Sequence, residues 1–226
     1  MKKVLFLVAT AMLLAGCNGL QKKNQLACNV NPDEVFGRHY TVEDFQFWDV
    51  LDVRGTEYAQ FMNLVSQYDI TITEGHPIMC TVRDTAALFA SATALCEELA
   101  KEGTRYYPRW MSENDTVCTL YFLFGKSTPD GVLPIMDGSM IDTASAEKSE
   151  FGMEYQVNFT FKDRYVRLWA EVTCERIGKC IAMTLGDKVL MAPMVNAEIT
   201  GGRCTVTGNF TLEEACALAQ ILNTKE

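Results

Sequence analysis

The chain has 226 residues, of which 48% are hydrophobic, 22% charged and 10% aromatic. This composition is typical of a globular protein and excludes a disordered or fibrous one. The 20 basic and 29 acidic residues leave a formal charge of −9, and we expect no nucleic-acid partner because an acidic chain repels phosphate backbones. No apolar run reaches the roughly 20 residues that a membrane-spanning helix needs.

The N-terminus has the pattern of an export signal. Two lysines follow the first methionine, and an apolar run of 11 residues extends from Val4 to Leu14. Leu14-Ala15-Gly16-Cys17 completes this segment. A basic start, a short apolar stretch and a small-residue cleavage site indicate a secretory signal rather than a membrane helix.

The four residues that end at Cys17 resemble the lipobox of bacterial lipoproteins. In that family the chain is cut before the cysteine, and the several acyl chains on this residue together give stable anchoring. The resemblance implies a signal peptide at residues 1–16 and a lipid anchor at Cys17, which places the protein in the bacterial cell envelope, outside the cytoplasm. No acidic residue directly follows Cys17, which favours the outer membrane over the inner one. A plain secreted protein is the alternative.

Eight cysteines remain beyond Cys17, and an even number in an exported protein permits disulfides. Their spacing is irregular, with no Cys-x-x-Cys pair and no zinc-binding pattern. Cys174 and Cys180 are a poor pair because a continuing helix would point them to different sides. We expect mostly reduced cysteines that pack as small apolar residues, notably Cys96, Cys204 and Cys216, with one or more disulfides as the alternative. The eight are Cys28, Cys80, Cys96, Cys118, Cys174, Cys180, Cys204 and Cys216.

The polar segment at residues 17–35 is predicted to be a flexible tether. Beyond it, the apolar periodicity changes repeatedly between that of strands and that of helices. We expect strands at 45–48, 69–73 and 117–124, an amphipathic helix at 56–68, and a helix from Asp84 to Gly103.

A turn-rich break at residues 126–131 predicts a domain boundary. After it we expect strands at 153–161, 181–185, 188–191 and 203–207, and a helix with an apolar face at 165–172 that Gly178 stops. Gly186-Asp187 suits a type II′ turn between two of these strands.

The last helix has a clear N-terminal signal in Thr211 and Glu214, which can form a capping box. Its core-facing residues are predicted to be Ala215, Leu218, Ala219 and Leu222. Paired strands with helices between them predict an α+β fold with largely antiparallel sheets.

Several spaced motifs in the C-terminal 100 residues resemble the head of the first periplasmic domain of SecD, including the fused SecD–SecF form. That family has a helix ending in Gly-Lys, a hairpin with Asp-Gly-Lys-Val, an Ala-Pro pair, and then Ile-Thr-Gly-Gly and Ile-Thr-Gly-Asn-Phe-Thr. The Phe-Gln-Phe-Trp at 45–48 is similar to the strand that opens the domain in SecDF. The matching residues, for which we expect structural roles, are Gly178, Lys179, Gly186, Asp187, Pro193, Thr200, Gly201, Gly202, Gly208 and Phe210.

This resemblance implies two small subdomains of sheet and helix, a base-like one at residues 36–125 and a head-like one at 126–226. SecDF assists Sec-dependent export, and its first periplasmic domain is thought to contact the emerging polypeptide. The sequence departs from the family in lacking its membrane helices, with their proton pathway, and the segment that returns from the head to the base. The hairpin reads Gly-Asp instead of Asp-Gly, which changes the turn type.

We therefore predict a non-enzymatic, lipid-anchored envelope protein that binds a polypeptide or an envelope partner and assists protein export. An interaction or structural subunit of a non-Sec envelope complex is one alternative, and a thiol-active protein is a less favoured one. No catalytic, cofactor-binding or metal-binding motif appears, and His39 and His76 are interpreted as loop residues. The sequence leaves the oligomeric state open.

The aromatic residues Phe45, Phe47 and Trp48 are the candidate partner-binding site. A strand places them on both of its faces, and the missing return segment would leave a sheet edge beside them unpaired. The alternative is that a loop covers this edge.

Overall fold

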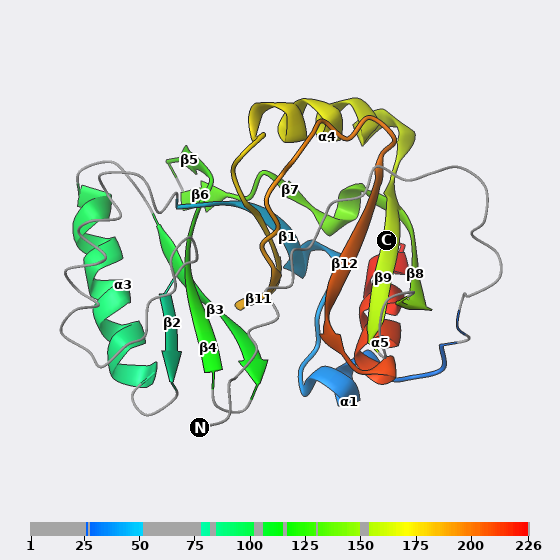
Figure 1. Ribbon diagram of the computed structural model, residues 1–226, viewed down its shortest axis with the longest axis horizontal. Helices are drawn as coiled ribbons and strands as arrows, with labels where there is room; N and C mark the ends of the chain where they lie inside the picture. The colour runs from blue at the N-terminus through cyan, green and yellow to red at the C-terminus, as the bar shows by residue number, and fades with distance from the viewer. Residues whose placement is uncertain are drawn as a thin grey trace, which may run out of the picture.

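The structure is a computed structural model that describes residues 26, 28–51, 78–81, 85–101, 106–114, 117–129, 131–149 and 154–225. Cys17, His76, the helix predicted at 56–68 and the strand predicted at 69–73 lie outside these residues. The described part has the predicted α+β fold, in which helices pack on two largely antiparallel sheets (Figure 1).

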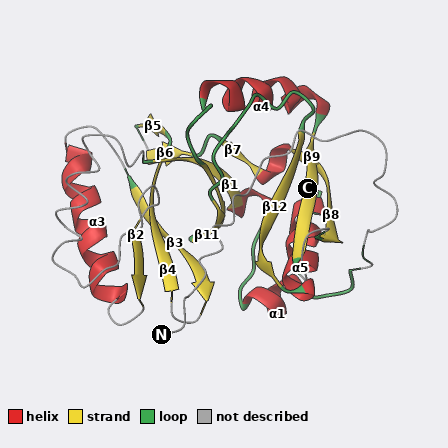
Figure 2. Cartoon of the chain, viewed as in Figure 1, coloured by secondary structure: helices red, strands yellow, loops and turns green. Residues whose placement is uncertain are grey.

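Seven strands form the larger sheet, in the order β2-β4-β3-β11-β10-β1-β7. Among the described strands of this sheet, only β11 and β3 pair in parallel. The end of β4 also pairs with β1, with Asp49 opposite Phe124 and Val50 opposite Leu123, so that the sheet curves back on itself (Figure 2). The strands are β1 (Phe45–Val50), β2 (Ile78–Thr81), β3 (Tyr107–Asn114), β4 (Val117–Phe124), β7 (Met136–Asp137), β10 (Ile181–Leu185) and β11 (Lys188–Met191). The sheet thus takes strands from both sides of the predicted boundary at 126–131.

The smaller sheet has the strand order β12-β9-β8, and α5 packs along it. Figure 1 shows α3 and α5 at opposite sides of the molecule, with α4 across one end. The elements are β8 (Ile141–Lys148), β9 (Tyr155–Phe161), β12 (Arg203–Phe210), α1 (Pro32–Phe36), α3 (Thr85–Lys101), α4 (Asp163–Glu175) and α5 (Leu212–Asn223). A small hairpin of β5 (Lys126–Thr128) and β6 (Gly131–Leu133) fills the turn-rich break, and 3-10 turns occupy η1 (Val42–Asp44) and η3 (Gly138–Met140).

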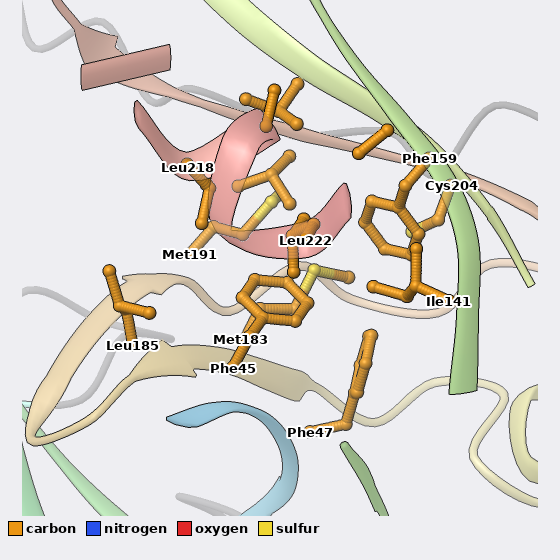
Figure 3. Close-up of a cluster of buried hydrophobic side chains, with 14 of the residues drawn as sticks. Phe45, Phe47, Ile141, Phe159, Met183, Leu185, Met191, Cys204, Leu218 and Leu222 are labelled. Atoms are coloured by element: carbon orange, nitrogen blue, oxygen red, sulfur yellow. The ribbon is translucent and has the colours of Figure 1, made fainter. Parts of the chain in front are cut away.

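The main core lies between the two sheets. Five aromatic side chains meet there with ring centroids 5.0–6.1 Å apart, a spacing that favours edge-to-face and tilted contacts. Aliphatic side chains from β10, β11 and α5 surround them (Figure 3). The five are Phe45, Phe47, Phe159, Phe161 and Trp169.

The last helix begins as predicted. The backbone N–H of Glu214 donates to the Thr211 hydroxyl at 3.1 Å, and the N–H of Thr211 donates to the Glu214 carboxylate at 2.9 Å. This capping box satisfies two backbone donors that a helix start would otherwise leave without partners. All four predicted core-facing residues of this helix are buried.

The hairpin between β10 and β11 also has the predicted turn. Gly186 has φ +59°, whereas Asp187 has no positive φ. A type I′ turn needs positive φ at both central residues, so this pattern fits type II′. The Gly186 N–H donates to the Asp44 carbonyl at 2.8 Å, which ties the turn to η1.

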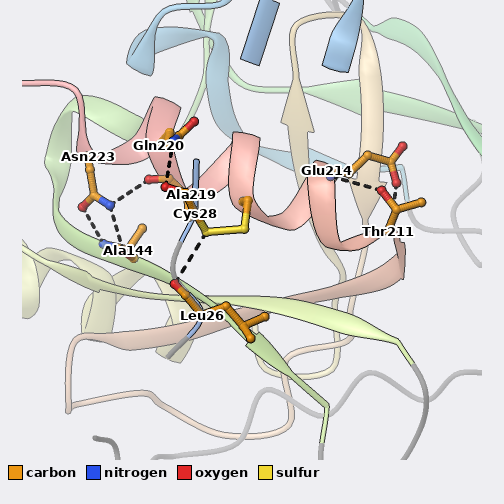
Figure 4. The surroundings of a disulfide bond; sticks show 9 residues. Leu26, Cys28, Ala144, Thr211, Glu214, Ala219, Gln220 and Asn223 are labelled. Carbon is orange, nitrogen blue, oxygen red and sulfur yellow. Dashed lines mark hydrogen bonds between the residues drawn. A yellow bond between two sulfur atoms is a disulfide. The ribbon is translucent and has the colours of Figure 1, made fainter. Parts of the chain in front are cut away.

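The described residues 28–35 correct this part of the flexible tether predicted at 17–35. Cys28 forms a disulfide with Cys216 on α5, with their Cα atoms 5.2 Å apart, and the Gln220 side chain donates to the Cys28 carbonyl at 3.4 Å (Figure 4). α1 then packs against α5. The prediction that Cys216 is a reduced packing cysteine is therefore wrong, whereas Cys96, Cys174, Cys180 and Cys204 form no disulfide. Spacing could not reveal the pair because 188 residues separate its members.

The outer edge of β8 is covered by side chain and backbone from other segments. The Asn223 amide donates to the Ala144 carbonyl at 2.8 Å and accepts from the Ala144 N–H at 2.9 Å (Figure 4). The Leu26 N–H donates to the Ala146 carbonyl at 3.2 Å. These bonds occupy groups that an edge strand would otherwise offer to another chain.

Candidate functional site

A groove of about 300 Å³ lies between α3 and β3. The helix supplies Phe89, Thr93, Cys96 and Ala100, whose spacing of three or four residues places them on one face. The sequence of α3 is rich in Ala, Leu and Glu, which are good helix formers. A volume of this size is at the lower end of that found for ligand pockets and can hold one or two side chains of a partner.

The strand side of the groove is aromatic. Tyr106, Tyr107 and Pro108 line it, and the Tyr106 side chain is buried. Apolar and aromatic walls with few polar groups are typical of binding sites because burying them against a partner removes apolar surface from water.

Among the described residues that line the groove, Arg109 is the one cation. Its Nη1 donates to the carbonyl of its neighbour Pro108 at 2.9 Å, and its guanidinium lies 5.6 Å from the centre of the Tyr107 ring. In the described part of the chain, no carboxylate lies within ion-pair distance of this side chain. Burial lowers the pKa of Arg109, against the opposing effect of the Asp187 charge, so its positive charge is only partly compensated.

Cys96 lies on the helix side of the same groove and is nearly fully buried. Burial raises the pKa of its thiol to about 12, and the charge of Glu97 acts in the same direction. The thiolate is the nucleophilic form, so this thiol is unreactive at neutral pH. The position of Cys96 therefore favours packing over thiol chemistry.

The aromatic strand predicted as a binding edge is instead part of the core. Phe45 and Phe47 are both 0% exposed (Figure 3). β1 pairs with β10 on one side and with β7 and β4 on the other, so the prediction of an open edge beside these residues is wrong. Trp48 is half-buried, donates to the Gln46 side chain at 3.2 Å and packs 5.9 Å from the Tyr107 ring.

Glycines from the predicted structural set lie at tight turns. Gly178, at φ +79°, donates to the Val195 carbonyl at 2.8 Å after α4 ends. Gly202 has φ +61°, and a Cβ atom there would lie 2.6 Å from Val166, so a side chain at this position is doubly unfavourable. Thr200 and Gly201 form the turn before it.

The remaining residues of the predicted structural set lie near the ends of strands. Lys179 accepts at its carbonyl from the Val195 N–H at 2.9 Å, and Pro193 accepts from Ile181 at 3.1 Å. Gly208 lies in the β12 irregularity, and Phe210 pairs with Tyr155 after it. Asp187 lies 3.7 Å from Arg38 in an exposed ion pair. Each of these positions sits in a turn, a strand pairing or a surface contact, and none of them lines the groove.

An ion pair joins α4 to the larger sheet. The Arg176 guanidinium donates to both oxygens of Asp49, at 2.7 and 3.0 Å, and its Nη1 donates to the Val172 carbonyl at 3.2 Å. The hydrogen bonds to Asp49 raise the pKa of Arg176. Both side chains are about 16% exposed, and the two-point geometry fixes the end of α4 over β1.

His39 is exposed and lies 3.1 Å from both Asp33 carboxylate oxygens. Among the described residues, no group of three His, Cys, Asp or Glu side chains could hold a metal ion. No helix in that part of the chain is long and apolar enough to cross a membrane.

The sequence did not predict the groove. β3 was not anticipated, because Pro108 and Arg109 interrupt its apolar pattern. The run Tyr106-Tyr107-Pro108-Arg109-Trp110 carries the available signal, since aromatic residues with one arginine are enriched at binding sites.

Comparison with known proteins finds a family match in the C-terminal part of the chain. Residues 130–225 match the family described as the SecDF P1 head subdomain. Protein translocase subunit SecD from Leptotrichia buccalis is 36% identical over 88 residues, which are 39% of this chain and 22% of that protein. Its counterpart from Rickettsia conorii is 38% identical over 88 residues, or 39% and 17% of the two chains.

Residues 130–225 thus form a SecDF P1 head-like domain, homologous to the periplasmic region of SecD. The chain spans only about a fifth of the length of these curated relatives. A solved structure of SecDF, described as a membrane component that enhances protein export, is similar over 79% of this chain and 92% of its own, with a TM-score of 0.39 and 19% identity. SecDF in its super-membrane-facing form is similar over 82% and 29%, with a TM-score of 0.39 and 16% identity.

Proposed function

We propose that this protein is a non-enzymatic lipoprotein of the bacterial cell envelope that binds polypeptides and assists protein export. The observation that carries the proposal is the match of residues 130–225 to the SecDF P1 head subdomain. Residues 126–226 would act as the head-like unit, and residues 36–125 as a base-like region. The ten motif residues would hold the head-like fold rather than contact the partner.

The proposed anchor is a lipid on Cys17 after removal of residues 1–16, with the outer membrane favoured. The pairing of Cys28 with Cys216 supports an extracytoplasmic location, since disulfides persist in oxidising compartments. Labelling with a palmitate analogue tests the anchor: the full chain should take up label, and Cys17→Ser should not. Uptake by the serine variant would contradict the proposal.

Crosslinking in cells, followed by purification of the full chain, tests the role in export. We expect Sec components or unfolded exported polypeptides among the captured proteins. Recovery of a stable non-Sec envelope complex and neither of these classes would favour an interaction subunit that reuses the fold. The groove lies outside the residues that match the family. This observation favours the second role.

A further inference from the structure

The groove between α3 and β3 contains an arginine without an ion-pair partner among the described residues. Two other arginines of this protein have carboxylate partners: Arg176 binds Asp49 through two hydrogen bonds, and Arg167 binds Glu171. Among the described residues, Arg109 contacts the carbonyl of Pro108 and the face of Tyr107, and the Asp187 charge acts on it from beyond ion-pair distance. A half-buried guanidinium gains most from a carboxylate, whose two oxygens match its planar array of donors.

The walls around Arg109 indicate what accompanies that carboxylate. Phe89, Ala100, Tyr106 and Tyr107 offer apolar surface. The volume of about 300 Å³ suits a short stretch of polypeptide that buries one or two side chains. Aromatic residues around one arginine are typical of the energetic centre of an interface.

From these contacts we infer that the α3–β3 groove binds an apolar polypeptide segment that contains a carboxylate, and that Arg109 pairs with this carboxylate. The carboxylate comes from a single Asp, a single Glu or a chain end within an apolar stretch. An acidic run is disfavoured because the whole chain carries a net charge of −9. The inference rests on the proposed function for the class of the partner, a polypeptide, and adds a site and a specificity.

Glu97 and Arg109 place opposite charges on the two sides of the groove. Glu97 lines the helix side, whereas Arg109 lines the strand side. No ion pair joins the two within the described residues. A bound carboxylate is therefore attracted toward β3 and repelled from α3, which orients the segment across the groove.

Two synthetic peptides test this specificity against the full chain. Each is a fluorescein-labelled 12-residue peptide of Leu, Ala and Ser with an amidated C-terminus, and the two differ only in a central Glu or Gln. Fluorescence anisotropy should show about tenfold tighter binding of the Glu peptide, as expected for one added charge-assisted pair. High salt should reduce this preference.

Three single substitutions assign the effect to the groove. Arg109→Gln should remove the preference, so that both peptides bind alike. Glu97→Gln should strengthen binding of the Glu peptide a few-fold, because it removes a repulsive charge. Arg164→Gln, at an exposed arginine on α4, is the matched control and should bind as the wild type does. Circular dichroism establishes that each variant is folded.

Equal binding of the two peptides by the wild type, or an unchanged preference in folded Arg109→Gln, would overturn the inference. Loss of folding in Arg109→Gln leaves the Glu97→Gln result to decide: weaker or unchanged binding of the Glu peptide also overturns it. These outcomes are separate from the crosslinking in cells. If export substrates are captured and the peptides are not distinguished, the proposed function stands and the groove is not the site.

Discussion

The two sides of this molecule use their aromatic residues differently. In the core half, formed by β1, β8–β12, α4 and α5, the rings of Phe45, Phe47, Phe159, Phe161 and Trp169 pack against one another and are buried. In the groove half, formed by α3 and β2–β4, Tyr107 is only half-buried; its ring lies 5.9 Å from that of Trp48 on β1, and both pack on a small cluster around Tyr121 and Leu123. The first arrangement stabilises the fold, and the second leaves apolar surface for a partner.

The family match follows this division. Most of the core half belongs to residues 130–225, whereas α3 and β2–β4 precede them. Homology to SecD therefore explains the stable scaffold and says little about the groove. Because core residues are constrained by packing, and surface sites by their partners, the groove half is where the specific role of this chain is to be sought.

The largest expected effect comes from breaking the core half. Phe47→Ala should lower the free energy of unfolding by about 3–5 kcal/mol, because it removes a ring that contacts four other aromatic rings of the core. Tyr107→Ala, in the groove half, should cost about 1–2 kcal/mol, since its side chain is only partly buried. Urea unfolding monitored by circular dichroism measures both. Equal losses would show that the two halves do not differ in packing.

The sequence predicted features in both halves where the signal is local, and the reason is physical. The capping box at Thr211, the type II′ hairpin and the strand at 117–124 depend on local chemistry that a few residues specify. The last of these lies in the groove half, so local signals work wherever they occur. The α3 helix was predicted for the same reason, because its periodicity and composition are local.

Long-range features were not predictable in this way. Phe45 and Phe47 look like an exposed aromatic edge until β7 and β10 are placed beside them. β8 was missed because two of its core-facing residues are alanines, which give no strand signal. The disulfide joins residues that are 188 positions apart, and no spacing rule connects Cys28 to Cys216. The groove lies between the consecutive elements α3 and β3, but it was missed because β3 was not anticipated.

The disulfide sharpens the comparison because both of its cysteines pack at the main core. Cys28→Ala with Cys216→Ala should lower the free energy of unfolding by about 2–4 kcal/mol, since the link restricts the unfolded chain over 188 residues. Hydrogen exchange should show a larger loss of protection in β8 and α5 than in α3. A reductant should reproduce the loss in the wild type and leave the double variant unchanged. Equal loss of protection in α3 would show that the halves unfold as one unit.

The Asp49–Arg176 pair tests the junction of the two halves. Asp49 lies opposite Phe124 of β4 and Ile181 of β10, so it borders both. Arg176→Ala should cost about 1–3 kcal/mol, because it leaves a largely buried carboxylate without its partner. The double variant with Asp49→Ala should lose less than the sum of the single losses. Additive losses, measured by urea unfolding, would mean that the pair does not act as a unit.

The smallest effect at neutral pH is expected from the buried thiols, which are present in both halves. Burial raises the pKa of Cys204 in the core half and of Cys96 in the groove half to about 12, against 9.0 for an ordinary thiol. Below pH 9 each thiol is neutral in the folded and the unfolded chain and adds no pH dependence. Between pH 9 and 12 each thiol ionises only in the unfolded chain, so the free energy of unfolding falls as pH rises, by about 1 kcal/mol per thiol at pH 10.

Cys204→Ala should flatten this alkaline decline in urea unfolding, whereas Cys174→Ala, at an exposed position, should leave it as in the wild type. An unchanged decline in Cys204→Ala would mean that this thiol ionises as readily in the folded core as in the unfolded chain.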